Sequence, residues 1–257
     1  MTISTTDLKI TWEKLPDDFI LEEQPLQNID QPLLAAALRE ILEIAGLILE
    51  EILVAPNMGI CATLDNKLVI KAPDLFYARN VQSLSSQEIR RSYTPNLEGE
   101  IPVFVMEFLS ATSYDEYSNK PTYPPGKWFF YRQVLRVPIY ALFEPAAGVL
   151  EVYQLDSSGD YQIQQPDLNG RYWIAGIGLF LGVWQGTKAE RTGYWLRWWD
   201  ESGEMLLWGA EMVERERQQR DLAQQQAEQE RERAEQERER SQRLAAQLRA
   251  AGIEPEA

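Results

Sequence analysis

Two acidic residues lie in segments where a carboxylate is energetically unfavourable. Asp74 follows Pro73 in KAPDLFYA, and Glu107 interrupts the apolar run IPVFVMEFL of residues 101–109. A lone buried carboxylate stays protonated, or destabilises the fold, unless a cation or a metal ion balances it. If the two segments are neighbouring strands, both side chains face one point at the strand ends. There they would hold Mg²⁺ together with the backbone carbonyl of Phe108.

A lysine stands at the start of the next predicted helix. Lys127 follows a Tyr- and Pro-rich loop, where its ammonium group could orient an attacking water and stabilise charge developing on a phosphate. Metal nucleases use a metal-bound water that attacks phosphorus in line. The structural alternative is that Asp74 caps a strand, Glu107 pairs with an arginine and Lys127 lies on the surface. Spacing alone favours this alternative.

The composition excludes several classes of site. The 257 residues include 40 acidic and 25 basic side chains, one cysteine and no histidine. Ser-His-Asp and Cys-His catalytic sites cannot form, and neither can an intramolecular disulfide or a zinc site built on histidine or cysteine ligands. Carboxylate, lysine and hydroxyl chemistry remain, and Mg²⁺ suits these ligands best.

Hydrophobic periodicity predicts the elements that would position these residues. In chain order they are a helix over 30–51, strands over 52–63, 68–77 and 101–109, a helix over 126–135, a strand over 137–143, and a hairpin of 149–155 with 161–164. The two strands before residue 78 are joined by an Asp65-Asn66 turn. This order predicts a mixed α/β (α+β) domain with a central sheet.

Tryptophan is concentrated after this domain. Six of the eight tryptophans lie between Gly170 and Gly209. Exposed aromatic side chains can stack on bases, but a packed aromatic hairpin at the edge of a sheet is the commoner arrangement. We therefore expect residues 166–210 to form an extension packed on a core of residues 1–165.

Residues 211–257 are predicted to form one long charged helix. AEQERER occurs at 227–233 and again at 234–240, so that glutamates and arginines lie three residues apart. The period of seven indicates a coiled coil, but each heptad has one small apolar residue where a dimer needs two. A solvated single helix is favoured, with a homodimeric coiled coil as the alternative. Gly252 and Pro255 would end the helix.

The net charge opposes general affinity for DNA. Residues 1–210 include 28 acidic and 16 basic side chains, a net charge of −12, which repels phosphates outside a local basic groove. The first residues lack a basic segment followed by an apolar run, and the weakly charged stretch 170–186 is short and interrupted by glycine. A cytoplasmic protein that makes no membrane contact is expected.

Several motifs together resemble a known family. They are PDL at 73–75, VMEFLS at 105–110, Lys127 with Tyr131, VPIYALFEP at 137–145 and the Glu/Arg/Gln-rich tail. This pattern resembles the Uma-type family of putative restriction endonucleases, abundant in cyanobacteria, within the PD-(D/E)XK nuclease superfamily. The resemblance covers roughly residues 15–155. It implies a restriction-endonuclease-like αβββαβ core with a mixed central sheet, in the element order found above, and the long helix follows it.

The resemblance also implies a role for each site residue. Asp74 stands at the PD aspartate, and Glu107 at the glutamate of an ExL variant of the ExK motif. Lys127 stands at a lysine that has moved to the following helix. These residues would form a site that uses Mg²⁺ or Mn²⁺ and acts on DNA.

The sequence departs from the family pattern near this site. Leu109 stands where ExK has lysine, and Ser110-Ala111 replaces a common Ser-Pro. The loop before Lys127 is longer than usual, so Lys120 is a second candidate for the lysine role. An acidic residue of the first helix often completes such sites, and Glu40 and Glu43 are both candidates.

Two functions from different classes follow. The first is an Mg²⁺-dependent endonuclease that hydrolyses DNA phosphodiester bonds. The alternative is a catalytically inactive nuclease-fold protein that acts as a binding or assembly module through its C-terminal helix. The acidic body and the altered motif motivate this alternative, and the endonuclease is the leading hypothesis. A tryptophan-lined module that binds carbohydrate or bases ranks third.

Overall fold

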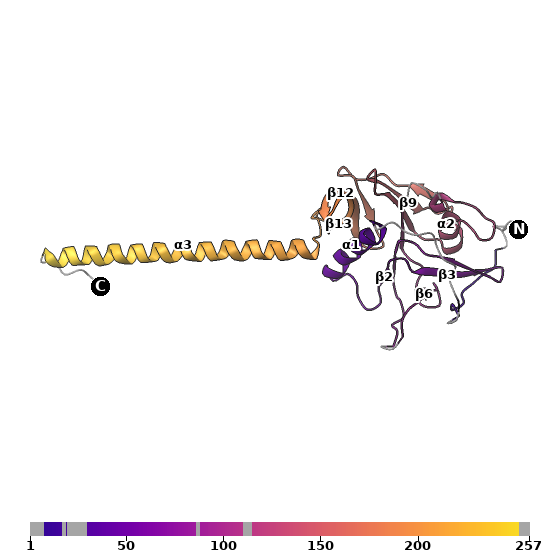
Figure 1. Ribbon diagram of the computed structural model, residues 1–257, viewed down its shortest axis with the longest axis horizontal. Helices are drawn as coiled ribbons and strands as arrows, with labels where there is room; N and C mark the ends of the chain where they lie inside the picture. Colours follow the sequence, from indigo (N-terminus) through magenta and orange to yellow (C-terminus); the bar gives the residue numbers. More distant parts are fainter. Residues whose placement is uncertain (1–7, 17–18, 20–29, 86–87, 110–114, 252–257) are drawn as a thin grey trace. The chain divides into compact units, whose positions relative to one another are not determined.

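The chain divides into two compact units, Met1–Trp208 and Gly209–Ala257. The computed structural model describes residues 8–16, 19, 30–85, 88–109 and 115–251 of these units (Figure 1). The first unit contains the sheets and is called the body here. The second is helical.

The body is built around a six-stranded mixed sheet in the order β10-β9-β8-β7-β5-β2. Its strands are β2 (Leu53–Ala55), β5 (Leu75–Ala78), β7 (Phe104–Phe108), β8 (Ile139–Glu144), β9 (Val149–Leu155) and β10 (Tyr161–Ile163). Neighbouring strands are antiparallel except β7 and β8, which are parallel. A parallel pair needs a crossover. Helix α2 (Lys127–Phe129) and the π-helical turn η2 (Phe130–Leu135) lie in that crossover. The predicted mixed central sheet is confirmed.

Apolar side chains cover both faces of this sheet. One hydrophobic cluster joins its first face to α1 (Asp30–Ile44) and to an antiparallel sheet of β11 (Arg171–Ile174), β12 (Leu179–Lys188) and β13 (Arg191–Trp199). Figure 1 shows α1 beside β12 and β13. A second cluster joins the other face to α2, η2 and a sheet of β1 (Ile10–Thr11), β3 (Gly59–Leu64), β4 (Lys67–Lys71) and β6 (Ser92–Tyr93). The central strands are therefore buried on both sides, as their continuous apolar runs predict.

Two predicted strands are each divided between two sheets. The prediction of one strand over 52–63 is wrong, because the chain leaves the central sheet after β2 and continues in another sheet as β3. The predicted strand 68–77 divides in the same way into β4 and β5. Pro56 and Pro73 lie at these two breaks, and proline has no N–H to donate within a sheet. The Asp65-Asn66 turn is confirmed, with φ of +48° and +61°.

The first helix is shorter than predicted. It ends at Ile44, and Gly46 follows with a φ of +70°. The Gly46 N–H donates to the Glu43 carbonyl, and the Leu47 N–H donates to the Leu42 carbonyl. This is a Schellman motif, in which the left-handed glycine satisfies the last carbonyls and stops the helix.

The tryptophan-rich segment is part of the body's core. Trp195, Trp198 and Trp208 are at most 2% exposed. The Trp198 indole N–H donates to the Leu38 carbonyl at 3.2 Å, and that of Trp208 donates to the Ala37 carbonyl at 3.1 Å. Buried indoles that hydrogen-bond to α1 hold that helix against the sheet and cannot stack on a base.

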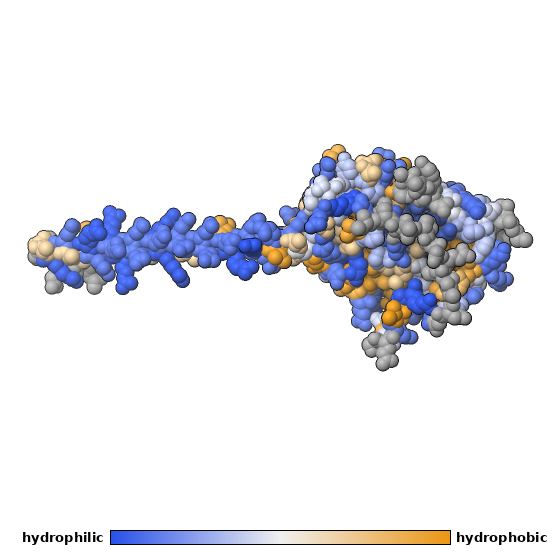
Figure 2. Space-filling model, in the orientation of Figure 1, coloured by the Kyte–Doolittle hydropathy of each residue, from blue (hydrophilic) through white to orange (hydrophobic). Residues whose placement is uncertain are grey.

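The second unit consists of α3 (Gly209–Ala250), a helix of 42 residues, all within the described part of the chain and none of them buried. At 1.5 Å per residue it is about 63 Å long. Figure 2 shows a mostly hydrophilic surface along it. Its exposed large apolar residues are Val213, Leu222, Leu244 and Leu248. The long helix is confirmed, whereas its pairing with a second copy stays a prediction. Gly252 and Pro255 lie outside the described residues.

Within the ranges described above, no helix is both long enough and apolar enough to cross a membrane.

Candidate active site

The register of β5 and β7 brings Asp74 and Glu107 opposite each other. Leu75 pairs with Met106 in this antiparallel ladder, so one further step along both strands places Asp74 across from Glu107. The Phe108 backbone N–H donates to Asp74 Oδ2 at 2.6 Å. Asp74 is 8% exposed and Glu107 is 0% exposed. The two carboxylates nominated from the sequence therefore meet in one buried place.

Lys127 and Tyr131 reach the same glutamate from the helix that follows. Lys127 Nζ lies 2.9 Å from Glu107 Oε2, and the Tyr131 hydroxyl donates to Glu107 Oε1 at 3.0 Å. Residues four apart lie on one face of a helix, which explains why both side chains point to one carboxylate. Tyr131 was part of the sequence motif, but its role as a partner of Glu107 was not predicted.

Helix α2 begins directly after Gly126, a position that has no room for a side chain. A Cβ on Gly126 would lie 2.0 Å from the Ser118 carbonyl oxygen. The Gly126 N–H donates to the Lys120 carbonyl at 2.9 Å, and the Phe130 N–H donates to the Gly126 carbonyl. The preceding loop therefore packs directly against the first helical turn and sets the direction in which Lys127 leaves the backbone.

A third carboxylate comes from that loop. Glu116 lies in the short 3₁₀ turn η1 (Asp115–Tyr117), is 6% exposed, and has Oε1 3.8 Å from Lys127 Nζ. The Tyr140 hydroxyl donates to the Glu116 backbone carbonyl at 2.9 Å. Glu116 was not among the site residues predicted from the sequence. Its loop has no regular periodicity, so no pattern indicated that this residue would be buried.

The other candidates from the sequence lie elsewhere. Glu40 pairs with Lys188 at 2.7 Å, and Glu43 pairs with Arg39 on the exposed side of α1. The first helix instead contributes Gln31, whose side-chain amide donates to the Phe108 carbonyl at 3.1 Å. Lys120 is exposed, so Lys127 is the lysine that contacts Glu107. Ser110-Ala111 lies outside the described residues.

Burial dominates the electrostatics of the two central carboxyls. It raises the pKa of Asp74, against the Phe108 N–H and the charge of Lys127, which lower it. Burial likewise raises the pKa of Glu107 to about 8, against Lys127 and Tyr131. Burial lowers the pKa of Lys127, but the nearby carboxylates, Glu107 first, raise it overall. The site therefore favours a protonated lysine, whereas burial opposes ionisation of the Asp74 and Glu107 carboxyls.

The donor set of this site fits a divalent cation. Asp74, Glu107 and Glu116 with Lys127 have a net charge of −2 when all are ionised, which one Mg²⁺ or Mn²⁺ would balance. Within the described ranges, no three acidic or cysteine side chains come close enough to hold a metal by themselves. Asp74 and Glu107 would be the protein ligands. The Phe108 carbonyl oxygen accepts a hydrogen bond from Gln31, and its second lone pair would be available to the cation.

The raised carboxyl pKa values predict how stability depends on pH in the metal-free protein. Between its ordinary pKa of 4.5 and its folded pKa of about 8, Glu107 binds more protons in the folded than in the unfolded chain. Stability therefore falls as pH rises through this window, and Asp74 acts in the same direction. We expect Glu107→Gln to lose less thermal stability than the parent between pH 5 and pH 8.

Thermal unfolding followed by circular dichroism in a chelator tests this dependence. Lys127 titrates above the window and does not contribute to the slope. A Glu107→Gln protein whose melting temperature falls with pH as steeply as the parent's would contradict it.

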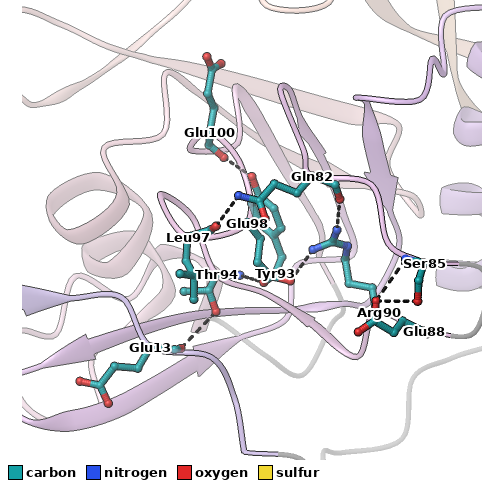
Figure 3. Close-up of polar contacts among 10 residues, drawn as sticks. All are labelled: Glu13, Gln82, Ser85, Glu88, Arg90, Tyr93, Thr94, Leu97, Glu98 and Glu100. Carbon is teal, nitrogen blue, oxygen red and sulfur yellow. Dashed lines mark hydrogen bonds and ion pairs between the residues drawn. The ribbon is translucent and has the colours of Figure 1, made fainter.

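A separate hollow of about 210 Å³ lies beside the 82–100 loop and includes Lys14, Arg90 and Arg91 among its lining residues. Arg90 forms an ion pair with Glu98 and donates to the Gln82 carbonyl (Figure 3). Glu98 also accepts a hydrogen bond from the Thr94 backbone N–H at 2.6 Å. These contacts hold the loop in place and engage the half-buried Arg90.

The central mixed sheet with its parallel β7–β8 pair, covered on both faces, defines a restriction-endonuclease-like α+β protein. The family model named Uma2, described as "Putative restriction endonuclease", matches residues 15–184, more than half of the chain. The chain belongs to this family. The match extends beyond residue 155, where the resemblance was expected to end, and reaches into β12.

No curated protein matches the chain. Among solved structures, the chain is similar to a crystal structure described as a putative nuclease belonging to DUF820 from Anabaena variabilis ATCC 29413. That chain is 12% identical, with 59% of this chain and 76% of that chain covered and a TM-score of 0.39.

Proposed function

We propose that this protein is an endonuclease that hydrolyses DNA phosphodiester bonds with Mg²⁺ or Mn²⁺. The observation that carries the proposal is the meeting of two buried carboxylates, those of Asp74 and Glu107, with the half-buried ammonium group of Lys127. Membership of the Uma2 family supports it. The three residues would then correspond to the aspartate, glutamate and lysine of a PD-(D/E)XK site.

Each residue has a task that its environment fits. Asp74 and Glu107 would hold the cation, which when bound supplies Lewis-acid stabilisation and an activated water. The Phe108 N–H fixes the Asp74 carboxylate, and the Tyr131 hydroxyl fixes that of Glu107. Lys127 stays protonated among carboxylates, so its ammonium group can orient a water and stabilise charge developing on the phosphate.

The acidic body has a consequence for this function. With a net charge of −12 over residues 1–210, the protein gains little from general attraction to DNA. The cation would reduce the repulsion at the site itself. Affinity for DNA is therefore expected to depend on the metal as well as on salt.

A plasmid assay tests the proposal. Supercoiled DNA is incubated with the purified protein in Mg²⁺, in Mn²⁺ and in a chelator, beside the Glu107→Gln protein. We expect nicked or linear DNA only with metal and only with the parent. Equal cleavage by the variant would contradict the role of Glu107 in the reaction. No cleavage by folded parent protein with either metal would contradict the proposal and favour the assembly module based on α3.

A further inference from the structure

Lys127 lies between two glutamates at unequal distances. Its Nζ is 2.9 Å from Glu107 Oε2 and 3.8 Å from Glu116 Oε1. Its side chain is 21% exposed, whereas the glutamate side chains are 0% and 8% exposed. The ammonium group therefore has one close partner and one that lies just beyond hydrogen-bonding distance.

The close partner is also the proposed cation ligand. Both oxygens of Glu107 are already engaged, one by Lys127 and the other by Tyr131. A divalent cation and an ammonium group repel each other when they share a carboxylate oxygen in a buried place. If Glu107 holds the cation, as the proposed function requires, Lys127 must find another anionic partner or remain charged without one.

We propose that Glu116 is a positioning residue that accepts Lys127 when Glu107 takes up the divalent cation. This proposal deepens the proposed function and rests on it. Lysine has a flexible four-carbon side chain with three donors, so a shift of about 1 Å toward Glu116 is enough to form the new contact. The exchange keeps the lysine charged and close to the reacting phosphate.

The surroundings of Glu116 suit this role. The Tyr140 hydroxyl holds its backbone carbonyl, and the Ser118 carbonyl packs against Gly126 at the start of α2. These two contacts fix the loop relative to the helix that presents Lys127. Neither contact involves the Glu116 carboxylate, so its replacement by glutamine leaves both in place.

Binding of Mn²⁺ by the full-length protein, measured by electron paramagnetic resonance, tests the proposal. We expect Glu116→Gln to weaken binding about tenfold, as loss of a residue supporting a metal ligand typically does. Lys127→Met should bind Mn²⁺ more tightly than the parent, because no ammonium group competes for Glu107. In the double variant, Glu116→Gln should have no further effect, since Glu116 acts through Lys127.

Several outcomes would overturn this role. Unchanged Mn²⁺ affinity in Glu116→Gln would show that Lys127 needs no second acceptor. An equal loss in the Lys127→Met background would make Glu116 a direct ligand. A similar loss in Glu144→Gln, an exposed and charge-matched control at the end of β8, would indicate a general charge effect.

Two further measurements distinguish a failure of the Glu116 role from a folding defect and from a failure of the proposed function. Glu116→Asp retains the charge on a shorter side chain and should bind Mn²⁺ more tightly than Glu116→Gln does. Its failure to do so, with a circular dichroism spectrum and melting temperature like the parent's, would contradict the role. A parent protein that binds no Mn²⁺ would contradict the proposed function and this role together, whereas the outcomes above concern Glu116 alone.

Discussion

The Asp74→Asn protein is expected to cleave plasmid DNA about 10³-fold more slowly than the parent in Mg²⁺ or Mn²⁺. Asp74 is buried opposite Glu107, and its Oδ2 accepts the Phe108 N–H. Asparagine has nearly the same shape but no charge, so the site loses one of the two carboxylates that balance a divalent cation. Removing one preorganised electrostatic group from an active site typically reduces the rate by this order.

The matched control for this variant is Asp65→Asn. Asp65 lies in the exposed turn between β3 and β4 at a φ of +48°, a conformation that asparagine adopts readily. The Asp65→Asn protein has the same chemical change away from the site and should cleave DNA at the rate of the parent. Initial rates of nicking at saturating metal give the comparison. An Asp74→Asn protein as active as the control would show that Asp74 is not a metal ligand.

The second large effect is on stability. We expect Trp208→Ala to lower the free energy of unfolding of the body by about 3–5 kcal/mol, as large aromatic truncations in cores do. Trp208 is 2% exposed, contacts Trp184 and Trp195 edge to face, and lies 3.6 Å from the Arg197 guanidinium. The variant would open a cavity beside that buried arginine and remove the hydrogen bond to α1.

Trp173→Ala is the control for this change. Trp173 is half-buried on β11 and packs against Phe180, so its truncation should cost less than half as much. Urea unfolding measures the free energy of unfolding of each variant, and the comparison holds if its dependence on urea concentration has the same slope in both. Equal losses in the two variants would mean that the tryptophans contribute to the body alike, irrespective of burial.

The central part of the fold could be predicted from local sequence patterns. Alternation and continuous apolar runs identified β7, β8 and β9 because a strand between two packed layers must be apolar on both faces. The charged heptads identified α3 because pairs along one helix need no other part of the chain. Asp74 and Glu107 were also identified from local sequence, because a carboxylate in an apolar strand is unfavourable without a partner.

Other features depended on contacts between distant segments. The changes of sheet at Pro56 and Pro73 were missed because a hydrophobic run does not show which sheet its residues join. Gln31 rather than Glu40 or Glu43 reaches Phe108 because the packing of α1 decides which of its faces meets the strand ends.

The carboxylates of the site show most clearly which features the sequence determines and which depend on tertiary structure. The residue types and their strands were determined by the sequence, because burial restricts which side chains an apolar strand tolerates. The placing of Glu116 beside Lys127 was decided only by tertiary structure. Its loop follows no period, and its position results from packing between the Ser118 backbone, Gly126 and Tyr140. In a helix or strand the same surroundings recur at a fixed spacing, so the sequence shows a periodic pattern. The contacts of a loop do not recur, so no periodic pattern in the sequence predicts them.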